Sequence, residues 1–235
     1  MAHDLNKAAR ICECEADHAI RFRSIISSPP WLVASRKDRM AAQFIGTVSV
    51  IWLEQPGEDR DMKLTKAFTF VDAAGLKWTV KKDAVINGAS IPRIFWTTFG
   101  PPFVGEYRRA SVVHDYFCDV RTRSAEATHH MFYEACVAGG VGVLKAKTMY
   151  TMVKTFGPNW KTLSSPLAIN GLEVLSRGQE VTVYRAMADD EFARLEKWVE
   201  ESNPSIEEID AEIERRSREM PVLPPEDERP AAAVM

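Results

Sequence analysis

The sequence predicts an α+β fold: a small antiparallel β-meander followed by a three-helix unit, with helical extensions at both ends. Strand-like alternation occurs between residues 44 and 86. Three segments with helical periodicity then follow one another from residue 106. The chain has 235 residues, 46% of them hydrophobic, which suits one core domain with appendages.

An N-terminal arm, residues 1–39, is predicted to precede the core domain, residues 40–162. Apolar residues between Leu5 and Phe22 have loose helical spacing. The run Ser27-Ser28-Pro29-Pro30 ends this helix, because proline lacks the N–H group that a helix interior needs.

The meander is predicted from four segments rich in Val, Thr and aromatic residues, which are 44–53, 62–71, 76–80 and 83–86. Short connections between them favour antiparallel pairing of neighbours. Three helices are then predicted at residues 106–119, 124–138 and 143–156. Ser124 is suited to cap the second helix, and Gly139-Gly140 is suited to end it.

A C-terminal extension is predicted over residues 163–220. It contains a β-hairpin between 172–175 and 180–184, and two acidic amphipathic helices at 190–201 and 206–218. Ser205-Ile206-Glu207-Glu208 is a capping box that starts the second helix. Residues 221–235 contain four prolines and no periodicity, so we expect a disordered tail.

Charge and composition exclude several classes of function. Thirty basic residues against 33 acidic ones leave a net charge of -3, which predicts no nucleic-acid partner. No apolar run approaches the roughly 20 residues of a membrane span. Four cysteines are too few for a disulfide scaffold, and the charged N-terminus does not resemble a secretion signal. We therefore expect cytoplasmic synthesis, with or without later incorporation into an assembly.

Chemistry is most strongly indicated in residues 110–118, a helix that is apolar on every side except at His114-Asp115. A buried ionisable pair is costly unless it is hydrogen-bonded, paired or metal-bound. His114 lies on the stripe that faces the core together with Cys118, whereas Asp115 points to one flank. His129 lies on the inward face of the next helix, so an antiparallel helix pair would bring it near His114.

Two interpretations of this group stay open. His114, Asp115 and His129 are candidate metal ligands, with His114 and Asp115 as the catalytic pair. Equally, a buried histidine can simply orient two helices through a hydrogen bond. Cys118 and Cys136 lie on apolar helical faces and are predicted to be structural thiols.

The segment before the helices contains Gly and Pro among apolar anchors, which predicts a packed irregular structure. A substrate groove would lie beside it, lined by Asn87, Ser90, Arg93 and Tyr107.

The motifs Asn87-Gly88-Ala89-Ser90-Ile91-Pro92-Arg93, Gly100-Pro101-Pro102 and His114-Asp115-Tyr116 resemble the domain-of-unknown-function family numbered 1353, over roughly residues 65–157. Members of that family occur in bacteria, prophages and phages and have no established activity. This chain has Asn87 where the family pattern usually has Asp, and His129 where Asp is expected in the second helix.

The His-Asp pair is also similar to the phospholipase A2 arrangement, in which His activates water and the neighbouring Asp holds calcium. The glycine-rich calcium loop and disulfides of those enzymes are missing here. Two histidines and a carboxylate would suit zinc better than calcium.

Two functions follow. The first is a phage- or prophage-type accessory or structural protein within a particle or multiprotein assembly, with partners or self-association through the C-terminal helices. The second is a metal-dependent hydrolase of cell-envelope lipid or peptidoglycan. The first predicts a closed site and exposed apolar residues at Phe192, Leu195, Ile206 and Ile209, and the second predicts an open cleft at His114. Asn87 and His129, which stand where the family pattern has Asp, favour the accessory or structural role.

Overall fold

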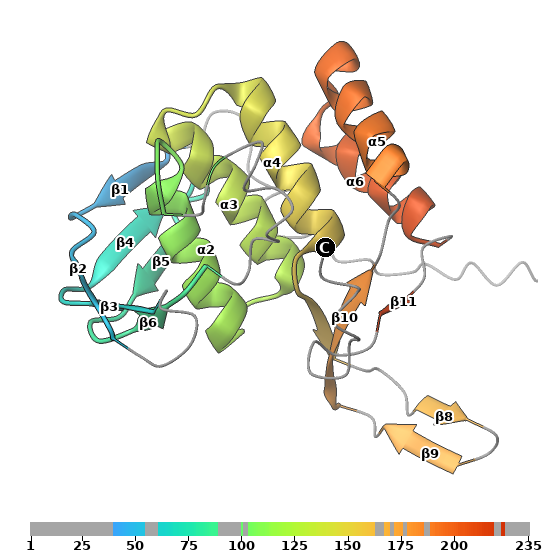
Figure 1. Cartoon of the computed structure of the whole chain (residues 1–235), viewed down its shortest axis with the longest axis horizontal. Coiled ribbons are helices and arrows are strands. Elements are labelled where there is room, and N and C mark those ends of the chain that lie inside the picture. The colour runs from blue at the N-terminus through green and yellow to red at the C-terminus, as the bar shows by residue number, and fades with distance from the viewer. Residues whose placement is uncertain are drawn as a thin grey trace, which may run out of the picture. The chain divides into compact units, whose positions relative to one another are not determined.

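A computed structural model describes residues 40–54, 61–88, 100, 103–162, 167–169, 172–175, 178–185, 189–218 and 222–223 (Figure 1). The predicted N-terminal arm and most of the predicted tail lie outside these residues. Contacts divide the chain into two units, residues 1–34 and 35–235, and the description below concerns the second. Its antiparallel strands followed by helices confirm the α+β prediction.

The meander consists of two three-stranded antiparallel sheets, labelled in Figure 1. One has the order β1 (Gln43–Ile45), β4 (Phe68–Val71), β5 (Lys77–Val80), and the other β2 (Val50–Trp52), β3 (Met62–Leu64), β6 (Val85–Ile86). One register runs through both sheets, since Gln43 pairs with Val71 while Trp52 pairs with Met62. The predicted strands 44–53 and 62–71 are thus each interrupted in the middle, the first at residues 46–49, where Gly46 has a φ of 85°, and the second at residues 65–67.

Three helices follow, as predicted: α2 (Arg108–Val120), α3 (Ala125–Gly139) and α4 (Val143–Phe156). The Ser124 side chain accepts a hydrogen bond from the backbone N–H of Ala127, which caps α3. Gly140, at a φ of 104°, ends that helix in the left-handed conformation that glycine tolerates. Helix α2 lies against β5 and β6, and Trp78 meets Phe117 edge-to-face at 5.0 Å between ring centroids.

The predicted hairpin between 172–175 and 180–184 is wrong. Strand β9 (Leu172–Leu175) pairs with β8 (Leu167–Ile169), while β10 (Glu180–Arg185) pairs with β7 (Asn159–Thr162). Asn-Gly is the sequence between Ile169 and Leu172, a strong two-residue hairpin signal that outweighs the longer connection after β9. Strand β11 (Val222–Leu223) pairs with β10, so these two residues of the predicted tail are ordered.

The C-terminal helices α5 (Asp189–Ser202) and α6 (Ile206–Ser217) begin and end close to the predicted positions, and the capping box of Ser205 and Glu208 is formed. Both helices contact α4. Their apolar stripes form a second core with α4, made of Tyr150, Leu195, Val199, Ile206, Ile209 and Ile213. The expected exposed apolar surface on these helices is therefore wrong, because the chain covers it with its own α4.

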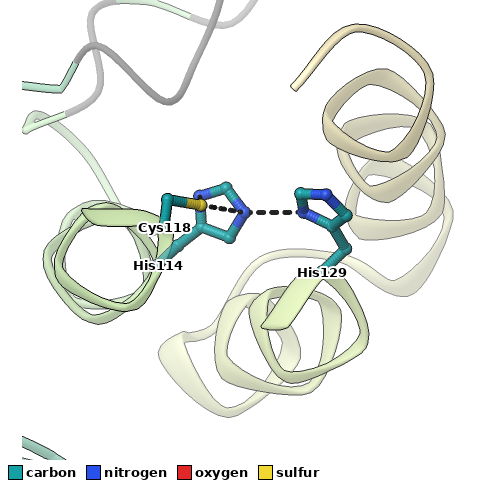
Figure 2. A group of neighbouring side chains, drawn as sticks. All are labelled: His114, Cys118 and His129. Atoms are coloured by element: carbon teal, nitrogen blue, oxygen red, sulfur yellow. Dashed lines mark hydrogen bonds between the residues drawn. The ribbon is translucent and has the colours of Figure 1, made fainter. Parts of the chain in front are cut away.

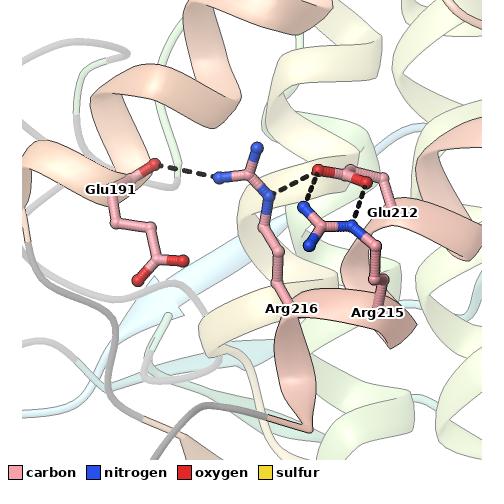
Figure 3. A network of polar contacts seen from close by, with 4 residues as sticks. All are labelled: Glu191, Glu212, Arg215 and Arg216. Atoms are coloured by element: carbon pink, nitrogen blue, oxygen red, sulfur yellow. Dashed lines mark hydrogen bonds and ion pairs between the residues drawn. The ribbon is translucent and has the colours of Figure 1, made fainter.

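Ion pairs reinforce this C-terminal part on its polar side (Figure 3). The Glu212 carboxylate accepts hydrogen bonds from both Arg215 and Arg216, and Arg216 also donates to the backbone carbonyl of Glu191 in α5. These hydrogen bonds lower the pKa of Glu212 to about 2, with that of Arg215 contributing most. Arg216 thereby links α6 to the start of α5.

The outer face of the sheets presents apolar residues to solvent instead. Ile45, Ile51 and Val85 are each about half exposed, and Trp52 at the end of β2 is 66% exposed. Ile51 and Val85 both pair with Lys63 across the strands. Among the helices that the structure describes, none is long and apolar enough to cross a membrane.

Candidate functional site

Helix α2 carries the predicted site through the middle of the protein. Its residues from Ala110 to Cys118 are all buried, and the exposed fraction is 0% for His114 and 7% for Asp115. The helix is buried because its residues are apolar on nearly every side, and because it packs against the sheets on one side and α3 on another. Both polar side chains must therefore find partners inside the protein.

His114 meets His129 of α3 in the contact that the sequence predicted (Figure 2). Nε2 of His114 lies 2.9 Å from Nδ1 of His129, and His129 is also 0% exposed. A hydrogen bond between two imidazoles needs one nitrogen to donate and the other to accept. The pair is thus satisfied without a carboxylate, as a neutral link between the two helices.

Burial keeps both rings neutral. Loss of solvation, followed by the neighbouring His129, lowers the pKa of His114 well below its usual value. Loss of solvation and the Lys154 charge lower the pKa of His129 to about 3. Near neutral pH neither imidazole carries charge, and neither has the pKa near the working pH that an efficient general base needs.

The second ring nitrogen of His129 has no hydrogen-bond partner of good geometry, although it is buried. The Pro158 backbone and the Asn159 side chain lie near enough to favour the charged ring. Proline has no N–H, so its contribution comes from the carbonyl oxygen. Nε2 of His129 is thus close to two hydrogen-bond acceptors, but it forms no hydrogen bond of good geometry with either.

Cys118 is the third member of the group, and it takes the place expected for Asp115. Its Sγ lies 3.6 Å from Nε2 and 3.8 Å from Nδ1 of His114. The three potential ligand atoms of His114, Cys118 and His129 all lie within 4.8 Å of one another. The spacing of four residues between His114 and Cys118 on one stripe is the signal that indicates this neighbour.

Asp115 lies on the flank of α2 to which the helical spacing points it. Its Oδ2 accepts hydrogen bonds from the backbone N–H groups of Asn87 and Gly88, both at 2.9 Å. The carboxylate therefore holds the chain at the end of β6, where Gly88 has a φ of 74°. Because it points to this flank, Asp115 is not part of the group around the two imidazoles.

The predicted groove residues are only partly brought together. Tyr107 is buried, and its hydroxyl donates to the Gly100 carbonyl. Burial raises the pKa of Tyr107 to about 12. Asn87 is exposed and offers its backbone N–H to Asp115. Ser90 and Arg93 lie outside the described residues.

A cavity that the sequence did not indicate lies on the far side of His129. Its volume is about 480 Å³, and Lys154, Asn159, Trp160 and Asp210 are among its lining residues. Asn159 and Lys154 also influence His129 electrostatically, and the Trp160 and His129 rings are 6.2 Å apart. Neither His114 nor His129 lines this cavity.

Residues 62–153 match the family described as "Protein of unknown function (DUF1353)", which confirms the predicted resemblance. Two uncharacterized proteins of Sinorhizobium fredii (strain NBRC 101917 / NGR234) are similar. y4jT is 44% identical over 126 residues, 52% of this chain and 38% of the relative. y4iH is 39% identical over 127 residues, 54% of this chain and 51% of the relative. The chain thus spans about half of these relatives or less. No solved structure matches it significantly.

Proposed function

We propose that this chain is a phage- or prophage-type accessory or structural protein that works within a particle or multiprotein assembly. The observation that carries the proposal is the His114–His129 contact. Both rings are fully buried, neutral and hydrogen-bonded to each other, which suits a link between helices rather than water activation. The carboxylate next to them is occupied by backbone N–H groups.

The surface offered to another protein of the assembly is the outer face of the sheets. Ile45, Ile51 and Val85 are exposed there, and Trp52 is exposed at the end of β2. Exposed apolar side chains of this kind favour contact with another protein. Trp is enriched among the residues that dominate protein interfaces. Self-association through the C-terminal helices is limited to their charged faces, since their apolar stripes are covered by α4.

Particle fractionation tests this proposal. Phage production is induced in a strain that carries the gene, particles are separated on a density gradient, and the protein is followed by immunoblot. We expect it to sediment with particles, and the double variant Ile51→Ser, Trp52→Ser to be lost from that fraction while remaining folded.

The control double variant is Val143→Ser, Leu144→Ser, which removes two exposed apolar residues from α4 and should leave sedimentation unchanged. Absence of the wild-type protein from particles and from any larger complex would overturn the proposal.

A metal-dependent hydrolase of envelope lipid or peptidoglycan is the second candidate, favoured by the convergence of three possible metal ligands on one point. It requires hydrolysis of phospholipid vesicles or purified peptidoglycan that depends on added Zn²⁺. His114→Gln should abolish that hydrolysis without unfolding the protein. Absence of hydrolysis in the wild type with Zn²⁺ would exclude this candidate for those substrates.

A further inference from the structure

We propose that His114, Cys118 and His129 form a binding site for a borderline-soft metal ion of the Zn²⁺ class, which ties α2 to α3. This goes beyond the accessory role, which holds with or without a metal. It also differs from the ligand set that the sequence indicated, because a thiolate replaces the Asp115 carboxylate.

The separations of the ligand atoms already resemble those of a coordination sphere. With Zn–N bonds near 2.05 Å and Zn–S bonds near 2.3 Å, a tetrahedral ion holds its ligands about 3.3 Å apart for two nitrogens and about 3.6 Å apart for nitrogen and sulfur. Here the two nitrogens are 2.9 Å apart and Sγ lies 3.6 Å from Nε2 of His114. Metal entry therefore requires the imidazoles to separate by about 0.4 Å. It also requires Sγ to lie about 3.6 Å from Nδ1 of His129, in a group whose three ligand atoms now all lie within 4.8 Å of one another.

The donor set selects the class of metal. Two imidazole nitrogens and one sulfur suit Zn²⁺, or Co²⁺ as its spectroscopic substitute. Ca²⁺ and Mg²⁺ require oxygen ligands, and the group contains none. The nearby Asp115 carboxylate, which would have favoured harder cations, is held by the Asn87 and Gly88 backbone.

Proton balance is straightforward. In the metal-free pair one proton lies between Nε2 of His114 and Nδ1 of His129. On binding, that proton moves to the other nitrogen of its own ring, and the Cys118 thiol releases its proton to solvent, so about one proton leaves per ion. In this tautomer Nε2 of His129 carries a proton toward the Pro158 carbonyl and the Asn159 side chain, which are the acceptor types that orient metal-bound histidines.

The geometry also explains the buried Nε2 of His129. In the metal-free protein this atom lacks a hydrogen bond of good geometry. If the His129 ring moved slightly toward a metal, its Nε2–H would change direction. The Asn159 side chain, which lines the neighbouring cavity, could then accept a hydrogen bond from it.

The test uses the full chain, treated with chelator, dialysed and titrated with Co²⁺ alone and then with Zn²⁺ alone. We expect one ion per chain, a thiolate-to-cobalt charge-transfer absorption, displacement of Co²⁺ by Zn²⁺, and release of about one proton per ion. Zn²⁺ should also raise the melting temperature, because it binds only the folded site.

Cys118→Ala is the decisive variant, since it leaves the imidazole pair in place. It should abolish the charge-transfer absorption and weaken Zn²⁺ binding on the order of 100-fold or more. Cys136→Ala is the matched control, because Cys136 is an equally buried thiol of the same helical unit outside the group. It should bind both ions like the wild type.

Asp115→Asn should likewise keep the absorption, since its carboxylate is not a ligand here. The proposal is overturned if folded wild-type protein takes up neither ion. It is also overturned if Cys118→Ala retains wild-type affinity, or if Asp115→Asn loses the metal while Cys118→Ala keeps it. None of these results alters the particle fractionation experiment, so the two proposals fail separately.

Discussion

The contact between α2 and α3 and the contact of α4 with α5 and α6 join helices of similar length by opposite means. The first places two imidazoles at its centre, both fully buried. The second places only apolar side chains and Tyr150 at its centre, with ion pairs such as Lys154–Asp210 at its edge. Histidine, whose ordinary pKa lies nearest to neutral pH, is thus at the centre of the first contact and not of the second.

This difference determines how each contact responds to solution conditions. A buried neutral histidine resists protonation, so acid favours the unfolded chain. Apolar burial does not titrate, and exposed ion pairs contribute little and weaken with salt. Of these two contacts, the α2–α3 contact is therefore the one that responds to acid, while the C-terminal contact depends on packing.

The largest expected effect is the acid sensitivity of the imidazole pair. Unfolded histidines titrate near pH 6.5, whereas the folded pKa is about 3 for His129 and well below 6.5 for His114. The unfolded chain thus binds more protons in this window, and stability falls as pH falls below 6.5. Between pH 7 and 5 the loss from His129 alone should be about 2 kcal/mol, and His114 adds to it in the same direction.

Urea unfolding in the presence of chelator measures this loss. His129→Gln should reduce the slope of stability against pH by about one proton. An unchanged slope in that variant would contradict the assignment of the effect to this pair.

The second largest effect is expected when an apolar side chain is shortened in the core that α4 forms with α5 and α6. Ile209 is 0% exposed between α4 and α6, so Ile209→Ala should lower the free energy of unfolding by about 3 kcal/mol. Urea unfolding at two pH values measures this change in the free energy of unfolding. The change should be the same at both pH values, because the substitution removes no ionisable group. Val143→Ala, at a half-exposed position, is the control and should cost less than about 0.5 kcal/mol.

The ion pairs of α6 should contribute less. Glu212→Gln removes the acceptor of Arg215 and Arg216 and should cost about 1.5 kcal/mol near neutral pH. Since the pKa of Glu212 is lowered to about 2, this contribution is present above the unfolded value of 4.5 and disappears as pH falls from 4.5 toward 2.

Denaturation of Glu212→Gln is compared with that of Glu214→Gln, because the Glu212 side chain is partly buried and the Glu214 side chain is exposed. The Glu214 side chain is 72% exposed and lies 4.0 Å from Arg218, so its replacement should change stability hardly at all. Equal losses in the two variants would contradict the importance given to the Glu212 contacts.

The smallest expected loss of stability comes from removing the N-terminal caps of α3 and α6. Ser124 caps α3, which carries His129, and Ser205 caps α6, and both side chains accept from a backbone N–H at 3.2 Å. Ser124→Ala and Ser205→Ala should each cost about 1 kcal/mol by thermal melting. A much larger loss for Ser124→Ala would mean that the cap also positions the imidazole pair.

Local patterns predicted much of this architecture because helices depend on neighbours in sequence. Helix α4 was predicted to the residue, and the capping box at Ser205 was read from four consecutive residues. The inward direction of His114 and His129 followed from helical periodicity alone. Their contact then needed only the antiparallel arrangement that a short connection favours.

Sequence alone determined the α+β class, the order of the helices and the facing histidines, because these depend on local periodicity and short loops. The tertiary structure decided which polar group each one meets. Asp115 accepts from the Asn87 and Gly88 backbone, and β10 pairs with β7 rather than β9. Such pairings depend on Å-scale distances between distant segments, which residue spacing does not encode.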